Sequence, residues 1–277
     1  NPVWTALTTK QAQMAHSNAL ARRFAPEMTL LGALAANTAM AFDSLAQLIQ
    51  RDAVTLYFTA PPNLPAGWEV LRAVELQQMV QEDKAAAEIV LAAAAGVGGS
   101  AEDAAAESMA VERASGQNTT TENAAVKNAG KERSVTEDAA ERGPAATEVL
   151  ELTAADVAEM SVVYTATRPG RTLCPRIQKI GTFLGVRDAG KLAAIGGLRL
   201  HIAGFREITS VATLPEFEGR GYATAIVRGL IERIRARGER PFLTVRSDNW
   251  RAIEIYRRLG FKERTRLYSR TVRRLAA

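Results

Sequence analysis

The sequence predicts a mixed α/β fold, in which helices pack on a mixed β-sheet. Beyond residue 147, apolar β-branched runs alternate with amphipathic helical runs in the order β, α, β, β, β, α, β, α, β. The chain has 277 residues, of which 47% are hydrophobic, and this is enough to bury a core. A long polar tract divides the chain, so we expect a smaller α/β region at the N-terminal side.

This N-terminal region is expected to cover residues 1–94. Helical periodicity predicts helices over 8–24 and 38–52, and AVTLYFTA at 53–60 predicts a strand that PPNLPAGW ends with a turn. The region contains no glycine-rich loop or paired acid. The roles open to it are structural support, substrate gating or a dimer contact, and a homodimer is therefore kept open.

Residues 95–146 are predicted to form a disordered linker of low complexity. No Phe, Tyr or Trp occurs between Trp68 and Tyr164, and most of the tract is Ala, Glu, Ser, Thr, Asn and Gly. Such a composition buries too little apolar surface to offset the entropy that is lost on ordering.

The C-terminal domain is expected to cover residues 147–277. Its first helix should begin at Thr153, because Asp156 three residues later completes a capping-box pattern. Gly190 suits a tight hairpin turn, and Gly238 and Gly260 suit helix ends. The predicted strands are 147–153, 181–188, 191–204, 205–215, 241–247 and 261–274, and the predicted helices are 153–167, 222–238 and 249–260.

Charge and cysteine content limit the function classes. The net charge is +5, but from Thr165 onward 24 Lys and Arg face 9 Asp and Glu, so this part attracts polyanions. Cys174 is the only cysteine and His16 and His201 are the only histidines, so no disulfide and no metal site are expected. Without a signal-peptide pattern or a long apolar tract, we expect a soluble cytoplasmic protein without a membrane partner, with the nucleus not excluded.

The stretch LPEFEGRGYATA joins a predicted strand to a predicted helix. Gly219 and Gly221 allow a sharp turn in which several N–H groups point outward at the helix start. These donors and the positive end of the helix dipole favour an anion such as a pyrophosphate. The alternative is an ordinary flexible connection, and a single GxG does not decide between the two.

The order of elements and two motifs resemble the GNAT superfamily of N-acetyltransferases, over about 130 residues. EGRGYA is similar to its (Arg/Gln)-x-x-Gly-x-(Gly/Ala) pattern, and SDNWRAIEIYRRLGF to its Asn-x-x-Ala-x-x-x-Tyr-x-x-x-Gly-Phe pattern. NPVWTALT, RPG and GTFLGVRD resemble a subgroup with a degenerate N-terminal half, related to glycine N-acyltransferase-like proteins. The resemblance implies a mainly antiparallel sheet with splayed central strands.

It also implies transfer of an acetyl group from acetyl-CoA to a primary amine, by direct attack in a ternary complex. The splayed strand would offer backbone groups to the pantetheine arm, and the glycine loop would hold the pyrophosphate. The cofactor-binding residues implied are Val211, Ala212, Thr213, Glu218, Gly219, Arg220, Gly221, Tyr222, Ala223 and Asn249. Glu218 departs from the pattern, because it stands where the family has Arg or Gln, and Arg220 could compensate its charge.

Two residues are predicted to be catalytic. Glu207 lies four residues before Val211, on the same face by strand alternation, and matches the general base of some family members. The other interpretation is a surface glutamate paired with Arg206 or Arg199. Tyr256 matches the tyrosine that protonates the leaving thiolate, or else packs in the core. Asn249 caps its helix, contacts the cofactor, or does both.

Two other functions remain open. Glu218 and the atypical N-terminal half suit an acyl-CoA-binding pseudoenzyme that acts as a scaffold. A nucleic-acid-binding module could use the basic helix, but its arginines are not interleaved with stacking aromatic residues, and no recognition motif is present. The expected partner is a small-molecule or peptide amine, whose identity the sequence does not reveal.

Overall fold

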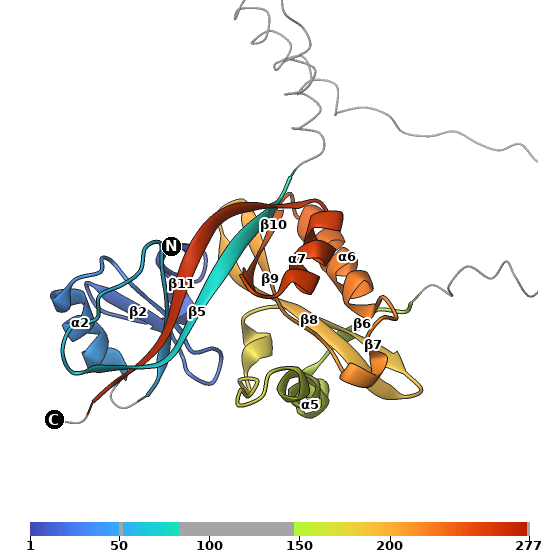
Figure 1. Ribbon diagram of the computed structural model, residues 1–277, viewed down its shortest axis with the longest axis horizontal. Coiled ribbons are helices and arrows are strands. Elements are labelled where there is room, and N and C mark those ends of the chain that lie inside the picture. Colours follow the sequence, from blue (N-terminus) through green and yellow to red (C-terminus); the bar gives the residue numbers. More distant parts are fainter. Residues whose placement is uncertain (50–51, 83–146, 276–277) are drawn as a thin grey trace, which may run out of the picture. The chain divides into compact units, whose positions relative to one another are not determined.

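The computed structural model describes residues 1–49, 52–82 and 147–275, which belong to one compact unit (Figure 1). The predicted linker and the end of the predicted N-terminal region lie outside the described residues. The division of the chain into three segments therefore stays a prediction. No helix in the described ranges is long and apolar enough to cross a bilayer.

In the N-terminal part, one predicted helix is wrong, two predicted elements are confirmed, and several further elements were not predicted. The helix predicted over 8–24 is wrong, because Asn18 turns the chain there by accepting hydrogen bonds from the N–H groups of Leu20 and Ala21. The helix after residue 38 and the strand after residue 53 are confirmed. The elements are α1 (Pro2–Thr8), η1 (Ala12–Met14), β1 (Ala15–Ser17), β2 (Ala21–Phe24), β3 (Leu31–Leu34), α2 (Ala39–Ile49), β4 (Val54–Phe58) and β5 (Trp68–Gln81).

The C-terminal part has every helix and strand that the sequence predicts. The capping box of Thr153 and Asp156 is confirmed, although the first turn that it starts is a 3₁₀-helix. The elements are β6 (Leu150–Leu152), η2 (Ala154–Asp156), α5 (Val157–Thr167), η3 (Ile177–Lys179), β7 (Phe183–Asp188), β8 (Lys191–Ile202), β9 (Phe205–Thr213), η4 (Pro215–Phe217), α6 (Tyr222–Arg235), β10 (Arg240–Arg246), α7 (Trp250–Arg258) and β11 (Phe261–Arg274).

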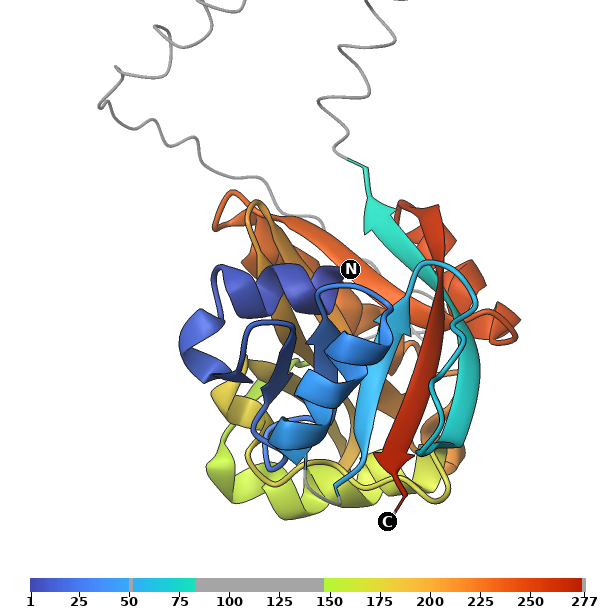
Figure 2. The ribbon, with the colours of Figure 1, turned by 90° about the vertical axis from the view of Figure 1, so that its left-hand side faces the viewer.

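All strands form one sheet in the order β1-β2-β3-β4-β11-β5-β10-β9-β8-β7-β6. Only the pairs β3–β4 and β9–β10 are parallel among the described strands, so the predicted mainly antiparallel sheet is confirmed. β5, which the sequence did not predict, pairs along its length with β11 and also with β10 (Figure 2). The N-terminal part therefore supplies a strand between two strands of the C-terminal part.

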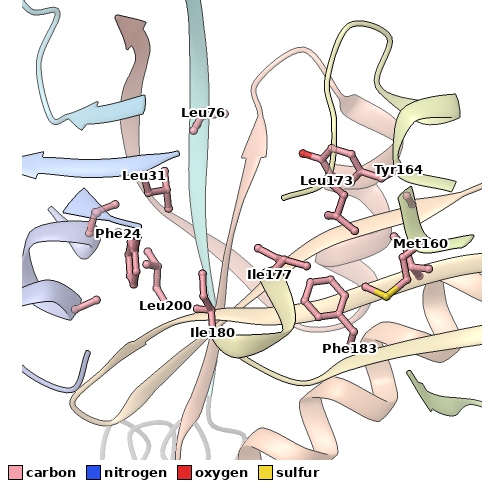
Figure 3. Packing of buried hydrophobic residues seen from close by; sticks show 14 of the residues in the cluster. Phe24, Leu31, Leu76, Met160, Tyr164, Leu173, Ile177, Ile180, Phe183 and Leu200 are labelled. Carbon is pink, nitrogen blue, oxygen red and sulfur yellow. The ribbon is translucent and has the colours of Figure 1, made fainter. Parts of the chain in front are cut away.

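Two apolar clusters cover the faces of the central strands. One contains residues of both parts of the chain, among them Phe24, Leu31, Leu76 and Phe183, together with residues of α5 (Figure 3). The other lies beneath α6 and α7 and includes Ile226 of α6. The C-terminal ends of β9 and β10 therefore lie between α5 on one face and α6 and α7 on the other. Most of the predicted cofactor-binding residues lie at or after these ends.

Candidate functional site

The pairing of β9 with β10 stops in the middle of both strands. It runs from Phe205↔Arg240 to Ile208↔Leu243. β9 continues to Thr213 beside β8, and β10 continues beside β5. Among the described strands, residues 209–213 therefore have no partner on their β10 side.

A bulge in β9 changes which side chains share a face. Ser210 has φ +56°, a left-handed conformation that a serine adopts only where its surroundings impose it, and the register with β8 shifts at this point. Ile208 and Val211 consequently pack against the same apolar cluster, beneath α6. The expectation that Glu207 and Val211 lie on one face by strand alternation is wrong for this reason.

The loop before α6 exposes a run of backbone donors. Gly219 and Gly221 have φ of +78° and +82°, and a Cβ on either glycine would meet no atom of the described residues within 4 Å. The first α6 bond is donated by the Ala225 N–H to the Gly221 carbonyl. Within the described residues, the N–H groups of residues 219–224 have no acceptor, so this helix start can bind an anion.

Charged side chains of the same loop are held by the β7–β8 hairpin. Arg220 donates to the Asp188 carboxylate at 2.6 Å, and the Tyr222 hydroxyl donates to the same oxygen at 2.7 Å. The hydrogen bond to Asp188 raises the pKa of Tyr222. Glu218 is exposed, so its carboxylate can point into water. The charge of Arg220 is already shared with Asp188, which limits its ability to compensate Glu218.

Glu207 is fully buried and takes part in a dense hydrogen-bond network. Its two carboxylate oxygens accept bonds from Nε and an Nη of Arg199, both at 2.9 Å. The Thr244 hydroxyl donates at 3.1 Å to one oxygen, and the Leu200 N–H donates at 3.4 Å to the other. Burial disfavours the charge of Arg199, but attraction by Glu207 and Tyr57 outweighs it and raises the pKa of Arg199.

This network accounts for all four lone-pair positions of the Glu207 carboxylate. The pairing with Arg199 that the sequence left open is therefore present, but it is buried rather than on the surface. The role of general base stays a prediction. To accept a proton from a substrate, the Glu207 carboxylate would first have to lose one of these four hydrogen bonds. The bond from the Thr244 hydroxyl is the one that an uncharged side chain donates.

Tyr256 lies on α7 and contacts Phe261 edge to face, with ring centroids 6.0 Å apart. Burial raises the pKa of Tyr256 to about 12, and the positive charge of Arg168 opposes this increase. The hydroxyl has no hydrogen-bond partner within residues 1–49, 52–82 and 147–275. At neutral pH it is therefore a protonated donor without a partner in this part of the chain.

Arg168 joins Tyr256 to the end of β9. Its guanidinium donates to the Val211 carbonyl at 2.9 Å and lies over the Tyr164 ring, 4.6 Å from the centroid. It also lies within electrostatic range of Tyr256. Sequence reasoning noted the RPG motif that begins with this arginine but gave the residue no role.

The remaining predicted residues lie at the end of β9 and at the start of α6 or α7. Val211, Ala212 and Thr213 form the end of β9 that pairs with β8 but not with β10. The Thr213 hydroxyl is buried without a partner in the described part of the chain. Asn249 caps α7 by accepting a hydrogen bond from the Ala252 N–H at 3.2 Å, as one interpretation predicted. Its contact with a cofactor stays a prediction, as do the cofactor contacts of the other residues, Ala223 included.

Val211 of β9, Tyr222 at the start of α6 and Tyr256 thus pack against one apolar cluster, while Glu207 lies on the other face of β9. Sequence reasoning missed Thr244 and Asp188, whose partners are distant in the sequence, and considered Arg199 only as a surface partner. In the described ranges, no group of three or more His, Cys, Asp or Glu side chains could hold a metal ion.

Comparisons with known proteins agree with this fold. A family model described as FR47-like protein matches residues 183–270. A structure from Novosphingobium aromaticivorans, described as an acetyltransferase from the GNAT family, is 26% identical with a TM-score of 0.70, over 99% of this chain and 97% of that one. A GCN5-related N-acetyltransferase from Kribbella flavida is 12% identical with a TM-score of 0.53, over 96% and 92%.

Two curated N-acetyltransferases without a characterised function match shorter segments. The protein of Methanocaldococcus jannaschii is 44% identical over 59 residues, which are 21% of this chain and 26% of that protein. The protein of Bacillus subtilis is 31% identical over 87 residues, which are 31% of this chain and 35% of that protein. The chain therefore matches only about a third or less of the length of these curated relatives.

Proposed function

We propose, since the chain belongs to the GNAT superfamily, that it transfers an acetyl group from acetyl-CoA to a primary amine by direct attack within a ternary complex. The observation that carries this proposal is the run of six N–H groups, from residue 219 to residue 224, that have no acceptor in the described part of the chain. They stand at the first turn of a 14-residue helix, where the dipole adds to their attraction for an anion.

The open end of β9 supports the same substrate. Residues 211–213 lie in the strand that leads to the loop, and among the described strands none pairs with them on their β10 side. Another extended chain could pair there, beside Arg168, which donates to the Val211 carbonyl. Such pairing is how a strand edge binds an extended ligand. The buried Thr213 hydroxyl lacks a partner among the described residues, and a polar ligand would supply one. These features fit the pantetheine amides and the diphosphate of acetyl-CoA.

Acetyl-CoA supplies an activated carbonyl carbon bound to a good leaving group. In the proposed reaction the ammonium group of the acceptor loses one proton, and the nitrogen of the resulting amine bonds to this carbon and loses a second proton. The carbon–sulfur bond breaks and the sulfur takes up one proton, so the products are an amide, a thiol and one released proton. Glu207 remains the proposed base for the amine proton, either directly or through water. Rotation of the Thr244 hydroxyl away from the carboxylate would free one lone pair for this purpose.

Tyr256 is the proposed donor to the leaving sulfur. Its pKa of about 12 keeps the hydroxyl protonated over the neutral range. A thiol has an ordinary pKa of about 8.5, which is lower than the pKa of Tyr256. The tyrosine therefore stabilises the departing thiolate by donating a hydrogen bond, and any proton that it gives up during the reaction is regained from solvent. Arg168 places a positive charge nearby, which also favours negative charge on the sulfur.

Replacing Gly221 with alanine tests the proposal. The αL conformation costs an alanine roughly 1–2 kcal/mol, so the loop should relax and turn N–H groups away from the anion. Loss of hydrogen bonds to a charged group, worth roughly 1.5–3 kcal/mol, predicts that the Kd for acetyl-CoA increases about 10- to 150-fold. Isothermal titration calorimetry measures this change.

Gly238→Ala provides a matched control. Gly238 also has a positive φ, +67°, with no atom within 4 Å of a Cβ, but it follows the opposite end of α6. This variant should lose similar stability and bind acetyl-CoA like the parent protein. If both variants bind acetyl-CoA equally well, or if the parent protein gives no binding heat, the loop does not hold the diphosphate.

A further inference from the structure

The hairpin between β7 and β8 contacts the glycine loop, residues 216–222, through both residues that flank its turn. The turn consists of Ala189 and Gly190, with φ of +48° and +81°, and positive φ at both central residues is typical of a type I′ turn. Asp188 and Lys191 flank the turn and lie directly opposite each other, so their side chains share one face of the hairpin. Both side chains reach the loop.

Asp188 binds the residues on either side of Gly221. Its Oδ2 atom accepts a hydrogen bond from Nη1 of Arg220 at 2.6 Å and another from the Tyr222 hydroxyl at 2.7 Å. The peptide units on both sides of Gly221 are therefore tied, through their neighbouring side chains, to one carboxylate that lies more than 30 residues earlier in the sequence.

Lys191 holds the start of the same loop. Its ammonium group donates a hydrogen bond to the Glu216 carboxylate at 2.6 Å. Nζ of Lys191 and Cζ of Arg220 also lie over the Phe217 ring, 5.7 and 5.1 Å from its centroid. The hairpin thus contacts the loop before, within and after its two glycines.

The loop has few restraints of its own. The Glu218 N–H donates to the Pro215 carbonyl, and among the described residues the next backbone N–H with an acceptor is that of Ala225. A Cβ on Gly219 or Gly221 would meet no described atom within 4 Å, so close packing does not fix these glycines. Glycine loses more conformational freedom on ordering than any other residue, so contacts from outside the loop have to supply the restraint.

The same contacts keep the hairpin from repelling an anion. The charge of Asp188 is paired with Arg220, and the charge of Glu216 is paired with Lys191. Removing Asp188 would release the loop, which weakens anion binding, and would also free the Arg220 charge, which strengthens it. The Arg220 side chain is 51% exposed, and water and salt weaken the attraction of such a charge for an anion. Release of the loop should therefore dominate.

We propose that Asp188 is a positioning residue for cofactor binding, which holds Arg220 and Tyr222 in place so that the N–H groups of residues 219–224 point toward the diphosphate. This inference rests on the proposed binding of acetyl-CoA and gives the β7–β8 hairpin a part in it. The hairpin arranges the loop before the ligand arrives, and less binding energy is then spent on ordering it.

Calorimetric titration of Asp188→Ala with acetyl-CoA tests the inference. We expect the Kd to increase about 5- to 30-fold, equivalent to roughly 1–2 kcal/mol, as for the loss of two ordinary hydrogen bonds. Asp188→Asn keeps an acceptor oxygen and should bind acetyl-CoA more tightly than Asp188→Ala. Glu69→Ala is the matched control, because it removes a carboxylate from an exposed ion pair with Arg273 and should leave the Kd unchanged.

Pantetheine separates positioning of the loop from a general effect on the fold. It has the arm of acetyl-CoA but no diphosphate, and its Kd is measured by competition with acetyl-CoA. This Kd should be the same for Asp188→Ala and the parent protein. An equal loss of affinity for both ligands would assign Asp188 to the fold as a whole and overturn the inference.

Tyr222→Phe removes one of the two hydrogen bonds to Asp188 and no charge. Its ring can keep the contact with the apolar cluster beneath α6. The variant should weaken acetyl-CoA binding less than Asp188→Ala does, and the double variant should bind no more weakly than Asp188→Ala alone, because both changes remove the same contact. Losses that add in full would show that Tyr222 acts without Asp188 and contradict the positioning role.

The two proposals fail in different ways. Unchanged acetyl-CoA binding by Asp188→Ala overturns the positioning role and leaves the proposed function intact. Tighter binding overturns it too, because Asp188 would then act mainly as a charge that repels the diphosphate. The absence of binding heat when acetyl-CoA is added to the parent protein contradicts the proposed function itself.

Discussion

Replacing Glu207 with glutamine is expected to lower the free energy of unfolding by about 3 kcal/mol. The change leaves the Arg199 guanidinium largely buried without its counter-charge, and breaking a buried ion pair from one side costs roughly 3–5 kcal/mol. The expected loss lies at the lower end of this range because glutamine still accepts a hydrogen bond from Arg199. For a protein of this size the loss corresponds to a decrease in Tm of roughly 6–12 °C, measurable by calorimetry.

Glu254→Gln is the matched control for this change. Glu254 pairs with Arg258 on the exposed side of α7, and such a surface pair contributes less than about 1 kcal/mol. If both variants lost the same small amount of stability, the buried position of the Glu207–Arg199 pair would contribute nothing beyond a surface contact.

The same variant tests the role of Glu207 in the reaction. If Glu207 takes the amine proton, kcat/KM should fall by roughly 10²- to 10⁴-fold near neutral pH, and by less at high pH, where the amine is already deprotonated in solution. The assay is run well below the Tm of the variant. A profile with the parent's shape would limit Glu207 to holding Arg199 in place.

Replacing Tyr256 with phenylalanine is expected to lower kcat by roughly 10²- to 10³-fold, a typical contribution of one general acid. The ring keeps its contact with Phe261, and the hydroxyl makes no hydrogen bond in the described part of the chain, so stability and the KM for acetyl-CoA should remain close to the parent values. Steady-state kinetics with a saturating amine measures both parameters.

The pH dependence makes the Tyr256 prediction specific. Because burial raises the pKa of Tyr256 to about 12, the hydroxyl is protonated throughout pH 6 to 10. The rate ratio of parent to variant should therefore stay constant over this range. A ratio that falls between pH 9 and 10 would indicate a tyrosine with its ordinary pKa. Tyr268→Phe, in the cluster beneath α2, removes a distant hydroxyl and should leave kcat unchanged.

Local signals predicted most of the C-terminal elements and the sharp turn of the glycine loop before α6. The loop was predictable because its two glycines and the following amphipathic run are adjacent in the sequence, and a helix start binds anions wherever it occurs. α6 shows the same advantage: its buried residues, such as Ile226 and Leu230, follow the period of a helix.

Features that depend on distant contacts were not predictable. β5 has mostly half-exposed or exposed residues in its first half, and its partners lie more than 150 residues away in the sequence. The bulge falls on a serine, which gives no local sign of a left-handed conformation. The pairing of Glu207 with Arg199 across a hairpin likewise appears only once the chain has folded.

Because β5 lies between β11 and β10, the C-terminal part should not fold well as a separate polypeptide. A polypeptide containing only residues 147–277 would keep both catalytic candidates but would leave the edges of β10 and β11 bare where β5 now lies. Two long unpaired edges are templates for strand exchange and aggregation. Such a fragment should therefore be insoluble or self-associating, and adding residues 1–82 as a separate chain is the natural way to rescue it.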